Sequence, residues 1–258
     1  MSSTCELWLL MRTIRSYEPG IVDIIFKCIK SHTFKTKKEL QEAVNLWCEN
    51  REECIKKYGH ISDWDVSNVT DMSCMFLNAK HFNQPIGDWD VSNVTDMSCM
   101  FYNATNFNKP IGDWDVSSVT CMNNMFSQAR KFNQPIGDWN VSNVANMSMM
   151  FDSPTKFNQP ISDWDVSNVT DMSCMFIKAI AFNQPIGDWD VSNVTDMSCM
   201  FYNATNFNKP IGDWDVSSVK YMSCMFIKAI AFNQPIGGWD VSNVTDMDKM
   251  FHRATKFN

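Results

Sequence analysis

The stretch IGDWDVSNVTDMSCMFYNATNFNKP, residues 86–110, decides the fold, because it recurs with few changes from residue 61 to residue 258. Its tryptophan returns every 25 residues without an insertion, at Trp64, Trp89, Trp114, Trp139, Trp164, Trp189, Trp214 and Trp239. A fixed period of this length is typical of repeat proteins, in which one unit cannot bury its own apolar face but a stack of units can. The sequence therefore predicts eight stacked coils, the last one incomplete, over residues 61–258.

The apolar residues of one unit change their spacing halfway along it. Residues 88–91 alternate polar and apolar side chains, which predicts a short strand with Trp89 facing inward. From Val94 to Ala104 apolar residues recur every three or four positions, which predicts a short helical or 3-10 segment. We therefore expect an α/β repeat solenoid, leucine-rich-repeat-like, in which each of the eight 25-residue coils has a short strand and a short helical or 3-10 segment.

Residues 1–60 lack the repeat and form a separate region. Thr36 and Glu39 have the spacing of a capping box, and the apolar stripe that follows them predicts an amphipathic helix. A second helix is expected over residues 52–58, ending at Gly59, and a further short helix over residues 21–29. We expect these helices to cap the first coil. The alternative is a docking region or adaptor, whose helices recruit a partner.

Two rows of aspartates flank the tryptophan ladder and are the candidate binding residues. If each tryptophan points inward, its neighbours on both sides point outward on the strand face. Coils in such a ladder lie about 4.8 Å apart, so neighbouring carboxylates repel by roughly 1 kcal/mol per pair in water. The 14 residues are Asp63, Asp65, Asp88, Asp90, Asp113, Asp115, Asp138, Asp163, Asp165, Asp188, Asp190, Asp213, Asp215 and Asp240.

Three arrangements would offset this repulsion. The aspartates can accept hydrogen bonds from the Ser-Asn corner or from backbone N–H groups. Ca²⁺ can bridge the rows, since it prefers oxygen ligands, although D-x-D-x-S-N lacks the Gly and the distal Glu of a calcium loop. The third arrangement is an unidentified protein partner, rich in Lys and Arg, on the acidic face. We expect a non-enzymatic protein-binding scaffold, with a structural or Ca²⁺-binding array as the alternative.

Charge and motifs narrow the class of protein. Residues 1–60 carry ten Lys and Arg against eight Asp and Glu, whereas residues 61–258 carry twelve against 21. An acidic array repels nucleic-acid phosphates and anionic membrane surfaces. The four histidines do not recur in register, and no catalytic motif is present, so we expect no enzyme, no catalytic residues and no cofactor other than the Ca²⁺ alternative. The asparagine row from Asn83 to Asn258 is expected to hydrogen-bond backbone at the turns.

The cellular compartment is predicted from the absence of a membrane span and of a signal peptide in the sequence. No apolar run reaches the roughly 18 residues that a membrane span needs, and no signal peptide is visible, which predicts an intracellular protein. None of the ten cysteines forms a CxxC pair, so we expect free thiols, with disulfides between neighbouring coils as the alternative. The chain stops inside a repeat without a polar cap, and end-to-end self-association at this end is a further expectation.

The motif W-D-V-S-N-V-T-D-M-S-x-M-F-x-x-A-x-x-F-N-Q resembles the 26-residue surface-protein repeat of the BspA-like leucine-rich-repeat family, over residues 61–258. The resemblance implies a leucine-rich-repeat solenoid and a surface protein tied to adhesion or protein binding. It implies location at the cell surface if the N-terminus is incomplete. It supplies no catalytic residues.

Overall fold

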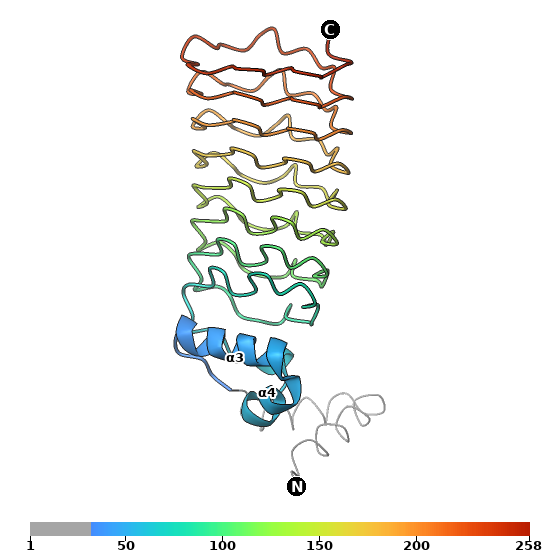
Figure 1. Cartoon of the computed structure of the whole chain (residues 1–258). Helices are drawn as coiled ribbons and strands as arrows, with labels where there is room; N and C mark the ends of the chain where they lie inside the picture. Colours follow the sequence, from blue (N-terminus) through green and yellow to red (C-terminus); the bar gives the residue numbers. More distant parts are fainter. Residues whose placement is uncertain (1–31) are drawn as a thin grey trace.

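The computed structural model describes residues 32–258 and shows two helices followed by a stack of coils (Figure 1). Helix α3 spans Lys37–Glu49, helix α4 spans Arg51–Tyr58, and a 3-10 turn, η1, spans Ile61–Asp63. The helix expected over residues 21–29, and with it the partner-recruiting segment, lies outside the described residues.

Helix α3 begins at the predicted capping box and covers the first coil (Figure 1). Thr36 Oγ1 accepts a hydrogen bond from Glu39 N at 3.2 Å. The Glu39 carboxylate accepts from Lys35 N at 2.9 Å, one residue earlier than in the standard box. The buried face of α3 includes Leu40 and Trp47, which join the core of the stack. Helix α4 ends at Gly59, whose φ of 78° is readily adopted by glycine.

The apolar slots of the repeat form one continuous core along the stack. The tryptophans are 3–9% exposed, so the prediction that they point inward is confirmed. Phenylalanine rings stack within and between coils: the centroids of Phe101 and Phe107 lie 4.0 Å apart, and those of Phe101 and Phe126 lie 5.6 Å apart. From Trp89 onward each tryptophan of the ladder also bonds the previous coil, as Trp114 Nε1 donates to Ile86 O at 3.1 Å. The core is therefore shared between neighbours and does not belong to single coils.

Backbone hydrogen bonds join the coils through a run of turns. In the coil of Trp89, the N–H groups of Met97, Cys99, Phe101 and Asn103 donate to carbonyls of the next coil at 2.8–3.0 Å. The intervening N–H groups close turns inside the coil, as Met100 N does on Met97 O at 3.2 Å. Cys99 and Asn103 have φ values of 55° and 56°, whereas the other residues from Met97 to Asn103 have negative φ. These two left-handed residues break the helical path, and all four inter-coil N–H groups point toward the next coil.

The prediction of an α/β leucine-rich-repeat-like solenoid, with a strand and a helical segment in every coil, is wrong. Residues 32–258 contain no strand, β-type pairing in them is limited to isolated parallel bridges such as Asp96 to Cys121, and the helices and η1 lie before residue 64. The predicted strand fails because Trp89 N bonds Ile86 O inside its own coil at 3.2 Å. The predicted helical segment fails because the left-handed residues interrupt it in every coil.

Candidate functional site

The aspartates that follow the tryptophans are used inside the fold. This Asp90 row comprises Asp65, Asp90, Asp115, Asn140, Asp165, Asp190, Asp215 and Asp240. Asp90 Oδ1 accepts from Ser92 N at 3.1 Å and from Ser92 Oγ at 2.6 Å. Asn140, the one uncharged member, accepts from Ser142 N and Oγ at 3.2 and 2.7 Å. The expected bonding to the Ser-Asn corner is therefore confirmed, and it needs an oxygen acceptor but no charge.

These serine hydrogen bonds favour the ionised carboxyl. Side-chain and backbone bonds from Ser117 lower the pKa of Asp115, and the bonds from Ser167 and Ser217 do the same for the residues two positions before them. The pKa of Asp65 is also lowered, first by the Ser67 hydroxyl, against a smaller opposing effect of burial. In these four aspartates the ionised carboxyl is therefore favoured while its oxygens accept the serine hydrogen bonds.

The aspartates that precede the tryptophans differ in their contacts. This Asp88 row comprises Asp63, Asp88, Asp113, Asp138, Asp163, Asp188 and Asp213, and all seven side chains are exposed. Asp63 and Asp163 accept from the hydroxyls of Ser62 and Ser162 at 2.9 and 3.0 Å. The other five have no hydrogen-bond or ion-pair partner within residues 32–258. The structure thus separates the 14 predicted residues into occupied and open acceptors.

A third row of acceptors was not among the predicted binding residues. It comprises Asp71, Asp96, Asp171, Asp196 and Asp246, with Cys121, Asn146 and Tyr221 in the remaining coils, and it carries the parallel bridges. Asp96 Oδ1 accepts from Ser98 N at 2.8 Å. The signal was present in the sequence, because T-D-M-S has the same Asp-x-Ser spacing as W-D-V-S.

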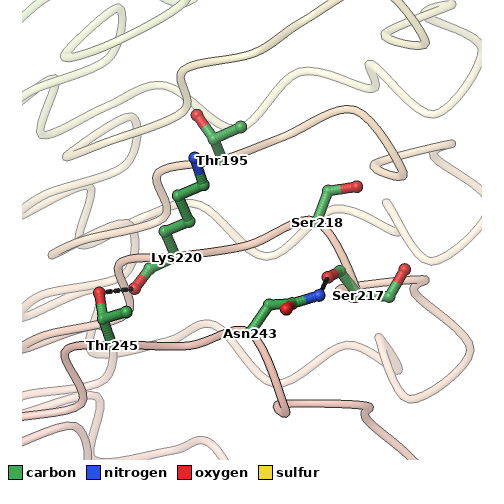
Figure 2. Close-up of a pocket in the computed structure, with 6 residues that line it drawn as sticks. All are labelled: Thr195, Ser217, Ser218, Lys220, Asn243 and Thr245. Carbon is green, nitrogen blue, oxygen red and sulfur yellow. Dashed lines mark hydrogen bonds between the residues drawn. The ribbon is translucent and has the colours of Figure 1, made fainter.

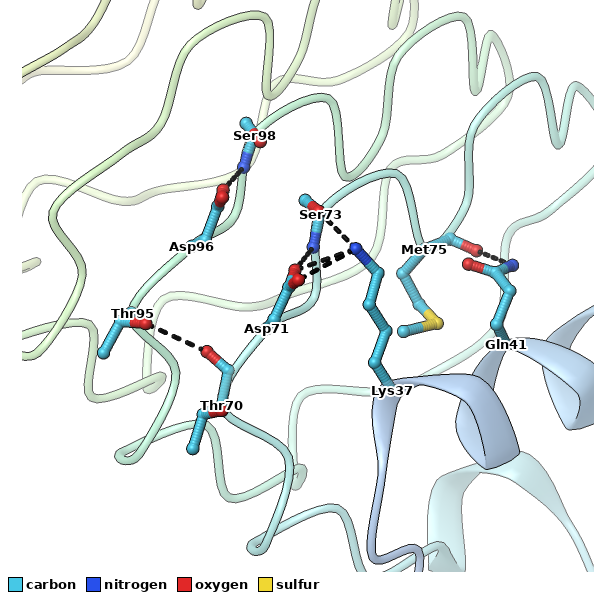
Figure 3. A network of polar contacts seen from close by, with 9 residues as sticks. All are labelled: Lys37, Gln41, Thr70, Asp71, Ser73, Met75, Thr95, Asp96 and Ser98. Carbon is cyan, nitrogen blue, oxygen red and sulfur yellow. Dashed lines mark hydrogen bonds and ion pairs between the residues drawn. The ribbon is translucent and has the colours of Figure 1, made fainter.

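Helix α3 contacts the first member of this third row (Figure 3). Lys37 Nζ lies 2.9 Å from Asp71 Oδ1 and also donates to the Ser73 hydroxyl, while Gln41 Nε2 donates to Met75 O at 3.0 Å. Burial raises the pKa of Asp71, but the bonds from Lys37 and Ser73 outweigh it and the pKa is lowered overall. Lys37 therefore neutralises the first carboxylate of the third row, where helix α3 packs against the first coil.

An open hollow of about 590 Å³ lies on the flank of the late coils (Figure 2). Its lining is Thr195, Ser217, Ser218, Lys220, Asn243 and Thr245. Ser218 replaces the corner asparagine of most coils; Asn193 and Asn243 donate to carbonyls of the previous coil at 2.8 Å, and Ser218 makes no such bond. The hollow contains hydroxyls, an amide and one lysine, and none of the predicted aspartates.

The acidic rows do not assemble into a metal centre. Among residues 32–258, no group of three or more His, Cys, Asp and Glu side chains has a geometry that could hold a metal ion. The Ca²⁺-bridging alternative therefore has no ligand cluster to support it in this part of the chain. Across the same residues, no helix has both the length and the hydropathy needed to cross a membrane. The asparagine row is structural, as predicted: Asn83 Oδ1 accepts from Asn108 N at 3.0 Å, and later coils repeat the contact.

Comparison with known proteins identifies one family. Its model, described as "Mycoplasma protein of unknown function, DUF285", matches residues 43–159, 106–204, 134–223 and 182–258. No curated protein and no solved structure matches the chain. The tandem repeat is therefore shown, whereas the BspA-like surface family expected from the motif is not confirmed. Because the four overlapping matches together cover far more than half of its length, the chain belongs to this Mycoplasma family of unknown function.

Proposed function

We propose that the chain is a non-enzymatic scaffold whose Asp88 row binds a Lys- and Arg-rich segment of a protein partner. The observation that carries the proposal is the difference between the two rows. The Asp90 row is engaged by serines, whereas Asp88, Asp113 and Asp138 are exposed on three successive coils without a partner. Open carboxylates repeated at the coil spacing favour a ligand with cationic groups along its length.

The physics of exposed ion pairs sets what such a surface can do. One exposed pair contributes about 0.2–1 kcal/mol, so a single coil holds no partner. Several coils acting together form a multivalent contact, in which the first pair raises the effective concentration of the next. A bound cationic segment would also relieve the repulsion along the row. The contact should weaken with added salt, because surface charges are screened over about 10 Å at 0.1 M ionic strength.

The resemblance to BspA-like surface proteins adds a setting to this proposal. In that setting the partner would be a protein met at the cell surface, and the scaffold would act in adhesion. The Asp88 row would make the contact whether the protein lies inside the cell or at its surface. A binding measurement on the purified chain therefore tests the proposal without knowledge of the location.

The test compares two triple variants with the same change in net charge. Asp88→Asn, Asp113→Asn and Asp138→Asn alter the open row, whereas Asp90→Asn, Asp115→Asn and Asp165→Asn alter the occupied row, where Asn140 shows that asparagine keeps the serine bonds. Affinity for a fluorescein-labelled decalysine is measured by anisotropy. At about 0.5 kcal/mol per lost pair, the open-row variant should bind about tenfold more weakly.

The occupied-row variant is the control. It should lose clearly less affinity than the open-row variant, and both variants should retain the circular dichroism of the natural chain. Equal losses in the two variants would mean that net charge alone attracts the peptide, and the assignment to the Asp88 row would then be wrong.

A further inference from the structure

The lysines and arginines of the stack gather at one end of every coil. Within residues 61–258, the segment 102–110 and its equivalents hold ten of the twelve Lys and Arg but only one of the 21 Asp and Glu, Asp152. The ten, called the basic edge from here on, are Lys80, Lys109, Arg130, Lys131, Lys156, Lys178, Lys209, Lys228, Arg253 and Lys256. None of them has an ion-pair partner among residues 32–258, where the two ion pairs involve Lys37 and Lys249. The net charge of −7 therefore hides a strong separation of charge within each coil.

The backbone reverses its direction at the basic edge. Ala104 N donates to Phe101 O and Phe107 N donates to Ala104 O, each at 3.0 Å, and the rings of Phe101 and Phe107 stack 4.0 Å apart. The chain then runs from Phe107 to Trp114, both buried, and the exposed Asp113 of the Asp88 row lies at the end of this run. The outer face of residues 107–114 and their equivalents, called the leg face, therefore has the basic edge along one border and the Asp88 row along the other.

Both charged borders keep the same register along the stack, which Figure 1 shows as one column of coils. Asn133 N donates to Asn108 Oδ1 at 3.0 Å and Trp139 Nε1 donates to Ile111 O at 3.1 Å, and the next coil repeats both contacts. Each of the eight coils carries at least one member of the basic edge, and each of the first seven carries one member of the Asp88 row. Between the two borders, Pro110 and its equivalents in the other coils are exposed and form an apolar strip.

We propose that the leg face pairs with the leg face of a second copy of this chain. A two-fold axis parallel to the stack exchanges the two borders, so that the Asp88 row of each copy meets the basic edge of the other and the proline strips meet between them. A two-fold axis across the stack would instead place like charges opposite each other. The contact uses the same surface on both copies, so it closes as a dimer. This inference rests on the proposed function, because it identifies the Lys- and Arg-rich partner of the Asp88 row as the basic edge of the second copy.

The charge pattern favours a second copy over a nucleic acid or an anionic membrane. An anionic polymer or lipid surface that contacted the basic edge would lie beside the carboxylates of the Asp88 row on the same face, which repel it. A second copy brings an opposite charge to both borders. Its charges also repeat at the coil spacing of the first copy, so one matched pair of coils holds the next pair in register.

The test is a charge reversal on matched coils, measured by sedimentation velocity of the full chain. The row variant carries Asp88→Lys, Asp113→Lys and Asp138→Lys, and the edge variant carries Lys109→Glu, Lys131→Glu and Lys156→Glu in the same three coils. At low ionic strength the natural chain should form a species of about twice its mass of 29.7 kDa as its concentration rises. Each variant alone should raise the dissociation constant of the dimer by more than about tenfold. An equimolar mixture of the two should dimerise again, because every reversed charge then meets its opposite, and this rescue also shows that both variants fold.

The control variant has the same net charge as the edge variant but leaves the leg face unchanged. It carries Lys38→Glu, Lys56→Glu and Lys220→Glu, and it should dimerise more readily than the edge variant. In about 1 M salt, where charges are screened over about 3 Å, the natural chain should return to the monomer.

Three results would overturn the pairing: a natural chain that stays monomeric at low ionic strength, a row variant that dimerises alone, or a mixture that does not restore the dimer. Binding of heparin or of anionic vesicles to the basic edge of a monomeric chain would also overturn it and would identify an anionic partner. The decalysine measurement separates the two proposals. A monomeric chain whose Asp88 row still binds decalysine selectively contradicts the pairing alone, whereas equal decalysine losses in the open-row and occupied-row variants contradict the proposed function.

Discussion

Small residues mark the places where one coil touches the next at the level of the backbone. A Cβ atom added to Gly212 would lie 2.5 Å from Pro235 O, closer than real Cβ contacts allow, whereas one added to Gly237 would meet nothing within 4 Å. The same slot holds Ser62 and Ser162 in two other coils, so a local shift of the backbone can admit a side chain there. A side chain at this slot therefore destabilises the fold through its contact with the next coil and not through an unfavourable φ.

This contrast predicts different effects for the same substitution at two equivalent positions. Gly212→Ala should lower the free energy of unfolding by about 1–3 kcal/mol, in the range seen for overpacking. Gly237→Ala should leave it within about 0.5 kcal/mol of the natural chain, as for an ordinary surface change. Urea denaturation of both variants checks the difference. Equal midpoints would show that the contact with Pro235 O relaxes without cost.

At the scale of the structural element, the sequence predicted which side chains point inward but not which carbonyl accepts each backbone N–H group. The alternation around Trp89 correctly gave an inward tryptophan and outward aspartates. The same alternation suits a strand or a turn-rich segment, because side-chain direction does not fix the partner of an N–H group. The spacing from Val94 to Ala104 correctly marked a buried face, but the helical or 3-10 segment predicted there does not form. The left-handed conformation at Cys99 was not predictable, since cysteine gives no signal for positive φ, whereas Asn103 carried a weak signal because asparagine is enriched there.

The binding residues were harder to predict than the direction of the side chains, because binding depends on which carboxylate oxygens already accept hydrogen bonds inside the fold. Both aspartate rows flank the tryptophans, but only the Asp90 row has a serine two residues later, and the contacts of Ser92 and its equivalents show what that spacing means. Helix α3 was predictable because its signals are local: a capping threonine and an apolar stripe. Its contacts with Asp71 and Met75 depend on how it packs, and so they appeared only in the structure.

The turns held by Asp115, Asp165 and Asp215 should make stability depend on pH. The pKa values of Asp115, Asp165 and Asp215 lie below the ordinary value of 3.8. A lowered folded-state pKa gives stability that is fully present above the unfolded pKa and is lost as pH falls through the folded value. The triple variant Asp115→Asn, Asp165→Asn, Asp215→Asn keeps the serine bonds and removes this titration. Its Tm should therefore fall less than that of the natural chain between about pH 4 and pH 2; parallel curves would contradict the assignment.

Across the whole molecule, the inter-coil bonds share a direction. In each of the first seven coils four backbone N–H groups donate to the next coil, and from the second coil on a bond such as Thr95 N to Thr70 O runs the other way. The net alignment of peptide dipoles resembles that of a helix, with carbonyl oxygens aimed toward α3. Lys37 and Gln41 bring a cation and an amide donor to that end (Figure 3). The cap therefore matches the first coil in charge as well as in apolar packing.

Because each coil contacts mainly its neighbours, a defect in the middle of the stack should act differently from one near its last coil. Phe126 is fully buried and stacks on Phe101 and Phe151 at 5.6 and 5.8 Å, whereas Phe251 stacks on one neighbouring coil, on Phe226 at 5.4 Å. Phe126→Ala should cost about 3–5 kcal/mol and uncouple the coils on either side, giving two guanidinium transitions by tryptophan fluorescence. Phe251→Ala should shift a single transition by less. One shared transition in the Phe126 variant would show that the stack unfolds as a unit, with coupling that extends beyond nearest neighbours.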